Sequence, residues 1–183
     1  MKESLLLALA SLLLSVVINP LTANATTSNG PVYGNTRDAN GILSFKGIPY
    51  AQPPVGSLRW KPPTTPATWK TPIDATKFCP TCYSFLAGGP PVGPQSEDCL
   101  IANVWTGANQ ADELCPVMIF IYGGGFEFGS SNNPTYDSTK FAGDGVILVS
   151  FNYRLGNFGF VALPQLDSEG PNSGLQAEYC CWS

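Results

Sequence analysis

The chain contains no histidine, and only 9 of its 183 residues are lysine or arginine, against 13 acidic residues. Without imidazole it has no histidine for proton transfer and no histidine to complete a metal shell. The scarcity of basic residues and the net charge of -4 leave no basic patch for nucleic acid or an anionic membrane. We therefore expect no nucleic-acid partner, no metal and no cofactor.

The sequence also lacks a linker, an internal repeat or a block of charge that would divide it, so we expect one core. One apolar stretch, Ser4 to Ile18, follows a charged start and precedes the small-residue site Ala23-Asn24-Ala25. This pattern is typical of a secretory signal peptide over residues 1–25, cleaved after Ala25. A membrane anchor is the weaker interpretation, because a spanning helix needs about 20 apolar residues. We expect a secreted, extracellular protein without a stable membrane anchor.

Six cysteines in a secreted chain indicate disulfides. Cys79 and Cys82 have the two-residue spacing of a redox or zinc motif, but the sequence has no second Cys-x-x-Cys. A structural disulfide is therefore the better interpretation.

Val117 to Gly129 contains a strand-like apolar segment that leads directly into three glycines. We expect a buried strand that ends in a loop with unshielded backbone N–H groups. Such donors can bind the negative oxygen that forms when an ester or amide carbonyl is attacked. A flexible strand-to-loop turn is an equally open interpretation, since short motifs match often by chance.

The remaining pattern predicts an α/β sheet, because two continuously apolar strands flank the glycine loop. Prolines and glycines predict an extended surface loop from Gly47 to Pro63 and an exposed loop from Ala87 to Pro94. From Phe158 to Leu163 we expect an apolar loop. The expected strands and helix are Gly30–Gly34 and Arg37–Lys46 with an Asn40-Gly41 hairpin turn, a short strand at Trp69–Ile73, strands at Glu97–Trp105 and Val146–Tyr153, and a short helix at Ser138–Gly143.

Four stretches, in this order, together resemble the type-B carboxylesterase and lipase family, whose fold is the α/β-hydrolase. They are Gly47–Trp60, Glu97-Asp-Cys-Leu100, Tyr122-Gly-Gly-Gly-Phe126, and Asn152-Tyr-Arg-Leu-Gly156 with Phe158-Gly-Phe160. The resemblance covers about Pro31 to Leu175 and is closest to fungal secreted lipases and esterases. It implies a small antiparallel N-terminal sheet followed by the first strands of a mixed central sheet.

The resemblance also implies roles for particular residues. The N–H groups of Gly124 and Gly125 match two of three oxyanion-hole donors, the third being supplied by the residue after the nucleophile. Cys99 is expected to pair with an upstream cysteine, and Cys82 fits better than Cys79. Arg59 and Glu97 match a structural ion pair, which we favour over a catalytic dyad of Glu97 with Asp98.

The family's nucleophile, acid and base are not in this sequence. There is no Gly-x-Ser-x-Gly, no histidine and no Ser-x-x-Lys. The resemblance therefore implies an N-terminal portion, residues 26–176, of an enzyme that acts on ester or lipid substrates. This chain is expected to be inactive alone. A non-catalytic, adhesion-type binding module of the same fold is the alternative.

Residues 177–183 depart from the family pattern. Ala177 stands where the family has an aspartate that pairs with the arginine matching Arg154, so Arg154 should lack that partner unless Glu178 replaces it. We further expect Val146–Tyr153 to have an open edge and one open apolar face, and the chain to aggregate. The sequence leaves the oligomeric state and the acyl-chain preference open.

Overall fold

The computed structural model describes residues 17–19, 23–84, 91–109 and 113–161. Most of the predicted signal peptide, the tip of the loop at residues 85–90 and the tail after residue 161 lie outside the described residues. The expected Arg154 partner at position 177 or 178 therefore lies outside them as well. Among the described residues, no helix is long and apolar enough to cross a membrane.

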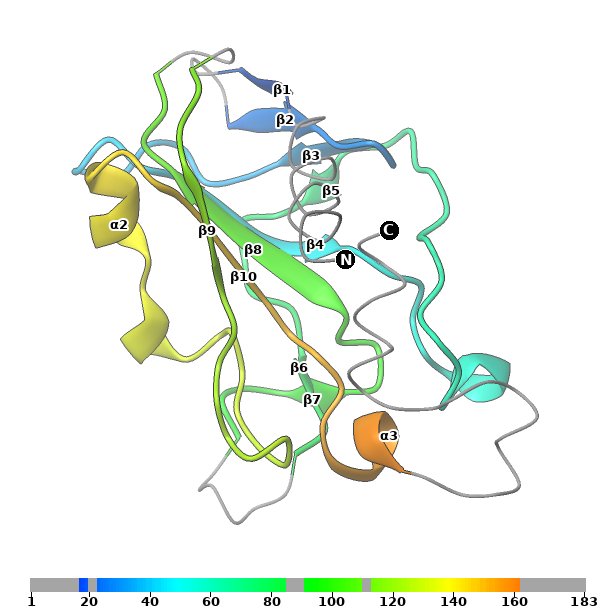
Figure 1. The fold of residues 1–183 in the computed structure, drawn as a ribbon. Coiled ribbons are helices and arrows are strands. Elements are labelled where there is room, and N and C mark those ends of the chain that lie inside the picture. The colour runs from blue at the N-terminus through cyan, green and yellow to red at the C-terminus, as the bar shows by residue number, and fades with distance from the viewer. Residues whose placement is uncertain (1–16, 20–22, 85–90, 110–112, 162–183) are drawn as a thin grey trace, which may run out of the picture.

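A mixed sheet of four strands forms the centre of the molecule (Figure 1). Its strands, in spatial order, are β4 (Leu43–Pro49), β8 (Ile101–Thr106), β10 (Ile147–Phe151) and β9 (Val117–Phe120). The pairs β4–β8 and β8–β10 are antiparallel, whereas β10 and β9 are parallel. The predicted mixed central sheet is therefore confirmed, as are the strands expected within Glu97–Trp105 and Val146–Tyr153.

A second sheet lies beside the first at the N-terminal end of the chain (Figure 1). β1 (Val17–Asn19), β2 (Asn24–Thr26) and β3 (Pro31–Tyr33) pair antiparallel in that order. β5 (Ile73–Asp74) adds to β3 in the parallel direction. Ala25 is buried inside β2, so the predicted signal-peptide cleavage point falls within a strand of this sheet.

The expected Asn40-Gly41 turn is present between β3 and β4, but these strands belong to different sheets, and only an isolated antiparallel bridge between Asn35 and Ser44 links the two arms of the turn. Asp38 N–H donates to the Ile42 carbonyl at 3.0 Å, and Gly41 N–H donates to the Asp38 carbonyl at 3.0 Å. Gly41 has a φ of 78°, a conformation that glycine adopts without steric cost. Local turn chemistry was sufficient to predict this feature.

Short helices connect the strands, and two of them differ from the sequence-based predictions. α2 (Thr139–Gly143) occupies the expected position. The predicted loop after Gly156 is instead the helix α3 (Gly156–Phe160), which aromatic contacts with distant segments stabilise. The predicted extended loop from Gly47 begins as the end of β4 and contains a 3-10 turn at Gly56–Leu58. The remaining elements are β6 (Thr81–Cys82), β7 (Gln95–Ser96) and the 3-10 turn Pro134–Tyr136.

The core lies on both faces of the central sheet. On one face, Phe45, Val104 and Val149 pack against buried Val32 and Ala75 of the N-terminal region. The other face packs against α2, and its buried cluster comprises Ile42, Trp105, Ala142 and Leu148. The parallel crossover from β9 through α2 thus places β10 inside the sheet, covered on both faces.

This topology overturns the prediction that Val146–Tyr153 has an open edge and an open face. β10 is enclosed by β8 and β9, and its residues from Leu148 to Phe151 are buried. Among the described residues β9 lies at the edge of the sheet, although we expected it to be a buried strand. Val117 and Met118 are each 44% exposed, and Ile121 just beyond the strand is 61% exposed.

Candidate functional site

The glycine-rich segment forms a tight turn directly after β9. Gly124 and Gly125 have φ values of 145° and 61°, and Phe126 follows with a φ of 65°. The Gly124 carbonyl accepts hydrogen bonds from the N–H groups of Glu127 at 3.1 Å and Phe128 at 3.2 Å. The chain therefore reverses around Gly124, and the backbone between Gly124 and Phe128 is compact.

The two central glycines are required for different reasons. A Cβ atom on Gly124 would lie 1.9 Å from the Phe128 carbonyl oxygen, which is far inside any allowed contact. A Cβ atom on Gly125 would meet nothing within 4 Å, but the left-handed φ still disfavours other residues. Position 124 thus requires glycine because of a close backbone contact, and position 125 favours glycine because of its backbone conformation.

The N–H groups of Gly124 and Gly125 have no acceptor in the part of the chain that the structure describes. Gly125 is exposed and Gly124 is partly exposed. Backbone N–H groups that are left unpaired on a fixed turn can donate to an external negative oxygen. The arrangement can therefore act as an anion-binding pair of donors.

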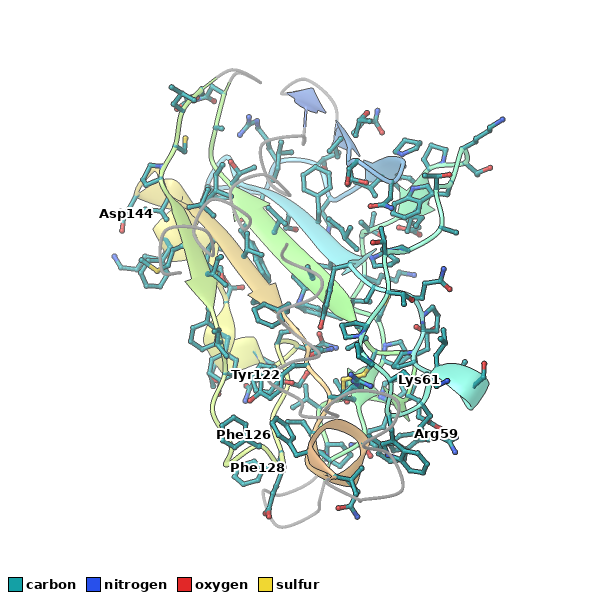
Figure 2. The ribbon with its side chains drawn as sticks, turned by 45° about the vertical axis from the view of Figure 1, so that its right-hand side comes forward. Arg59, Lys61, Tyr122, Phe126, Phe128 and Asp144 are labelled. Carbon is teal, nitrogen blue, oxygen red and sulfur yellow. A yellow bond between two sulfur atoms is a disulfide. The ribbon has the colours of Figure 1, made fainter. Side chains whose placement is uncertain are left out.

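Contacts with the end of β10 and with α3 hold this turn in place. Tyr122 stacks on Tyr153 with ring centroids 4.5 Å apart, and Tyr153 Oη donates to the Tyr122 carbonyl at 2.8 Å. Gly156 N–H donates to the Phe126 carbonyl at 2.7 Å, and the Phe126 ring lies 4.8 Å from that of Phe160. Figure 2 shows Tyr122 and Phe126 at the same end of the sheet as α3. The turn is thereby fixed at both its ends.

A buried polar network beneath the turn was not predicted from the sequence. Asn152 Oδ1 accepts from both the backbone N–H and the hydroxyl of Ser131, each at 2.9 Å. Asn103 Nδ2 donates to Ser131 Oγ at 3.0 Å, and Asn103 Oδ1 accepts from Gly47 N–H at 2.9 Å. All three side chains are at most 1% exposed. The available sequence signal was an asparagine inside the otherwise apolar β8, Asn103, and another directly after β10, Asn152.

A hollow of about 200 Å³ adjoins the glycine turn. One wall comes from the turn and the segment after it, and the other from the segment around β6. The lining residues include Gly123, Phe128, Ser130, Tyr136, Thr81 and Ser84. The hollow therefore borders the turn at Gly123 and Phe128, and neither Gly124 nor Gly125 is among its lining residues.

Cys82 and Cys99 form a disulfide that joins β6 to the start of β8. Cys79 and Cys115 are free thiols. Burial raises the pKa of the Cys79 thiol, and the carboxylates of Asp98 and Asp74 raise it further. Cys79 is therefore held in its protonated, poorly nucleophilic form.

Arg59 and Glu97 form a bidentate ion pair. Arg59 Nε and Nη2 each donate to a different oxygen of Glu97 at 2.6 Å. The guanidinium also lies 6.0 Å from the centre of the Phe158 ring on α3, and Figure 2 labels Arg59 near that helix. Asp98 is exposed and takes part in no ion pair among the described residues. The geometry is that of a positioning contact between two loops and α3.

Arg154 is 5% exposed and lies between the paired tyrosine Tyr153 and the buried Leu155. In the described part of the chain, no group of three or more histidine, cysteine or acidic side chains is arranged to hold a metal ion.

The comparisons with known proteins agree with this geometry. The sequence model of the carboxylesterase family matches residues 22–176. The chain belongs to the carboxylesterase family. It is 43% identical over 155 residues to fumonisin B1 esterase of Sphingopyxis macrogoltabida, covering 84% of this chain and 28% of that enzyme. It is 44% identical over 156 residues to para-nitrobenzyl esterase of Bacillus subtilis (strain 168), covering 82% of this chain and 31% of that enzyme.

Solved structures of this carboxylesterase group share the fold. A PNB esterase structure superposes with a TM-score of 0.75 at 41% identity, covering 85% of this chain and 32% of that chain. A thermophilic PNB esterase gives a TM-score of 0.76 at 40% identity, covering 85% and 33% of the two chains. The fold is therefore that of an α/β-hydrolase. This chain spans less than a third of the length of these two relatives. The likeness to fungal members stays a prediction.

Proposed function

We propose that this chain supplies the oxyanion-hole portion of a carboxylic-ester hydrolase. The observation that carries the proposal is the pair of unpaired N–H groups at Gly124 and Gly125 on a sterically fixed turn. In ester hydrolysis the carbonyl oxygen becomes negative as the nucleophile attacks, and two such donors stabilise that charge. The adjoining hollow provides room for part of the ester.

The substrate class is a carboxylic ester, including lipid esters. The relatives are named for esters of different kinds, namely fumonisin B1 and para-nitrobenzyl esters. The hollow beside the turn has both hydroxyl groups, from Thr81 and Ser84, and aromatic walls, from Phe128 and Tyr136. Such a lining suits a substrate with polar and apolar parts.

Within the printed sequence there is no histidine and no Gly-x-Ser-x-Gly. Loss of a triad serine or histidine lowers turnover about a million-fold. The purified 183-residue protein is therefore expected to hydrolyse p-nitrophenyl esters no faster than a buffer blank.

A chimera provides the direct test of the oxyanion proposal. Residues 26–176 would replace the matching segment of the Bacillus subtilis para-nitrobenzyl esterase, which is 44% identical here. The chimera should hydrolyse p-nitrophenyl esters, and Gly125→Val should lower kcat by about 10²-fold or more because the side chain crowds the donors. Val55→Ala, at an exposed position outside the site, is the matched control. A folded chimera whose kcat is unchanged by Gly125→Val would refute the role of this turn.

We also propose that the protein is secreted after removal of its N-terminal leader. The apolar segment at Ser4 to Ile18 supports this, and so does the Cys82–Cys99 disulfide, since disulfides persist in oxidising compartments. N-terminal sequencing of protein from the culture medium tests it. The expected start is Thr26, and retention of the apolar segment in the secreted protein would contradict the proposal.

A further inference from the structure

Trp60 adopts a backbone conformation that is rare for a residue of its size. Its φ is 62°, in the left-handed region that glycine favours and that crowds the side chain of any other residue. Within the described ranges only one other non-glycine residue lies in that region, Phe126 of the glycine turn, with a φ of 65°. Such conformations persist where surrounding contacts fix them, and they concentrate at functional sites. The contacts of both residues lead to the same element, α3.

The helix α3 is too short to be stable by itself. An isolated helix is marginal in water below about 12 residues, and Gly156–Phe160 has 5. The first N–H groups and the last four carbonyl groups of a helix also have no partner inside that helix. Contacts from other segments must therefore hold α3 in place and pair these groups.

Trp60 pairs one of these carbonyl groups. Its indole Nε1–H donates to the Asn157 carbonyl at 2.9 Å. Asn157 is the second residue of α3, so its carbonyl is among the last four of the helix. The Arg59 guanidinium lies 5.7 Å from the centre of the Trp60 ring and 6.0 Å from that of Phe158 on α3. The Trp60 side chain is thus held against the helix.

Phe126 is attached to the other side of α3. Its carbonyl accepts from Gly156 N–H, one of the first N–H groups of the helix, at 2.7 Å, and its ring lies 4.8 Å from that of Phe160. In Figure 2 the labelled Phe126 and Arg59 lie on opposite sides of α3. Because Phe126 directly follows Gly125, a shift of its backbone would change the direction in which Gly125 presents its N–H group.

We infer that Trp60 is a positioning residue for the oxyanion-hole turn and that it acts through α3. Its indole fixes Asn157, and the adjacent Gly156 fixes Phe126 next to the donor group of Gly125. This inference rests on the proposed oxyanion role of the glycine turn. Without the indole N–H, α3 would shift and the donors would bind the negative oxygen of the transition state less well, whereas binding of the uncharged ester would change little.

Amide hydrogen exchange of the 183-residue protein tests the link between Trp60 and the turn. Trp60→Phe keeps an aromatic ring and removes the donor. Exchange of the Gly156 amide should become about 10-fold faster, the factor that corresponds to a typical hydrogen bond. The Asn152 amide, which donates to the Ile101 carbonyl at 3.0 Å, should exchange at its original rate. An unchanged Gly156 rate overturns the inference, and so does equal acceleration at Asn152, because that result indicates general unfolding.

Trp69→Phe is the matched control. Trp69 Nε1–H also donates to a backbone carbonyl, that of Pro31 in β3, at 2.7 Å. The control therefore removes the same kind of hydrogen bond at a position that has no contact with α3 among the described residues. It should leave exchange of the Gly156 amide unchanged. Equal acceleration by the two tryptophan variants would overturn the specific role of Trp60.

Kinetics of the chimera with the Bacillus subtilis esterase test the consequence for catalysis. Trp60→Phe should lower kcat for p-nitrophenyl esters by about 10-fold with KM nearly unchanged, because the donors act on the transition state. Combined with Gly125→Val, it should cause little further loss, since both changes act on the same donors. Trp69→Phe should leave kcat unchanged. A rise in KM alone, or fully additive losses in the double variant, overturns the inference.

The same kinetics separate the two proposals. If Gly125→Val leaves kcat unchanged, the oxyanion role fails, and the positioning role that rests on it fails as well. If Gly125→Val lowers kcat and Trp60→Phe does not, the oxyanion role stands and the positioning role of Trp60 alone is refuted.

Discussion

β9 and β10 are neighbours with similar sequences and opposite environments. Val-Met-Ile-Phe and Ile-Leu-Val-Ser-Phe are both short apolar segments that pair in parallel. Yet β10 lies between two strands and is buried from Leu148 to Phe151, whereas β9 pairs on one side only among the described residues and has two exposed side chains. Burial is set by the position of a strand in the sheet, and composition alone does not determine it.

The largest expected difference between the two strands is in stability. Leu148→Ala in β10 removes a side chain that is 3% exposed and should lower the free energy of unfolding by about 2 to 5 kcal/mol. Met118→Ala lies at the paired position in β9, where the side chain is 44% exposed, and should cost less than about 1 kcal/mol. Urea denaturation of both variants measures the difference. Similar losses would contradict the difference in burial between the two strands.

Two asparagines in the segments that follow the strands, Asn152 after β10 and Asn133 at the 3-10 turn Pro134–Tyr136, differ in burial in the same way. Asn152 follows β10, and its Oδ1 accepts two hydrogen bonds from buried Ser131. Asn152→Ala leaves those donors unpaired, so we expect a loss of about 1 to 3 kcal/mol in urea denaturation. Asn133→Ala removes an exposed cap whose Oδ1 accepts from Thr135 N–H at 3.0 Å. Its loss should be about 1 kcal/mol or less, and the reverse order would contradict the importance of the buried network.

The turn after β9 is the fixed part of an otherwise uncovered region. Gly124→Ala would bring a Cβ atom to 1.9 Å from a backbone oxygen, whereas Gly125→Ala meets open space at a φ of 61°. Gly125→Ala should cost about 1 to 2 kcal/mol from its conformation alone, and Gly124→Ala should cost more. Thermal unfolding of the two variants measures this order. Equal Tm values would show that the turn relaxes freely.

The smallest expected effect concerns α2, which connects the two strands. Hydrogen bonds from the side chain and the backbone of Thr139 lower the pKa of Asp137, and the charge of Lys46 lowers it further. A lowered pKa stabilises the folded state above the ordinary carboxyl pKa of about 3.9, and that contribution is lost as pH falls through the folded-state value. Asp137→Asn should therefore flatten the acid side of the stability profile slightly. Tm measured from pH 7 to pH 2 tests this, and an unchanged acid slope would remove Asp137 as a contributor.

Much of the local structure could be predicted from the sequence. The Asn40-Gly41 turn, the short helix α2, the strands within Glu97–Trp105 and Val146–Tyr153 and the glycine turn all follow from local chemistry, because glycine conformation and apolar pattern act over a few residues. The strand expected at Trp69–Ile73 is present only as β5, Ile73–Asp74. The family resemblance also predicted the fold that the comparisons confirm. It suggested Cys82 as the partner of Cys99, and the structure has that disulfide.

Features that depend on distant segments could not be predicted. α3 is a helix because rings from Tyr83 and Phe126 pack on it, which the sequence around residue 158 does not reveal. The Asn103–Ser131–Asn152 network joins three segments that are far apart in the chain. The sequence around α3 does not indicate which rings will pack on it, and the sequence around Asn103 or Asn152 does not indicate the hydrogen bond to Ser131.

The sequence by itself indicated an apolar strand on each side of a glycine turn, and the family resemblance assigned the donor role to the N–H groups of Gly124 and Gly125. Turn geometry and steric exclusion at a glycine are local properties, because they depend on residues close by in the sequence. Only the tertiary structure decided that β10 is the interior strand and β9 the edge, because strand order depends on which distant segments pair. The same local pattern therefore produced a buried strand in one place and an open edge in the other.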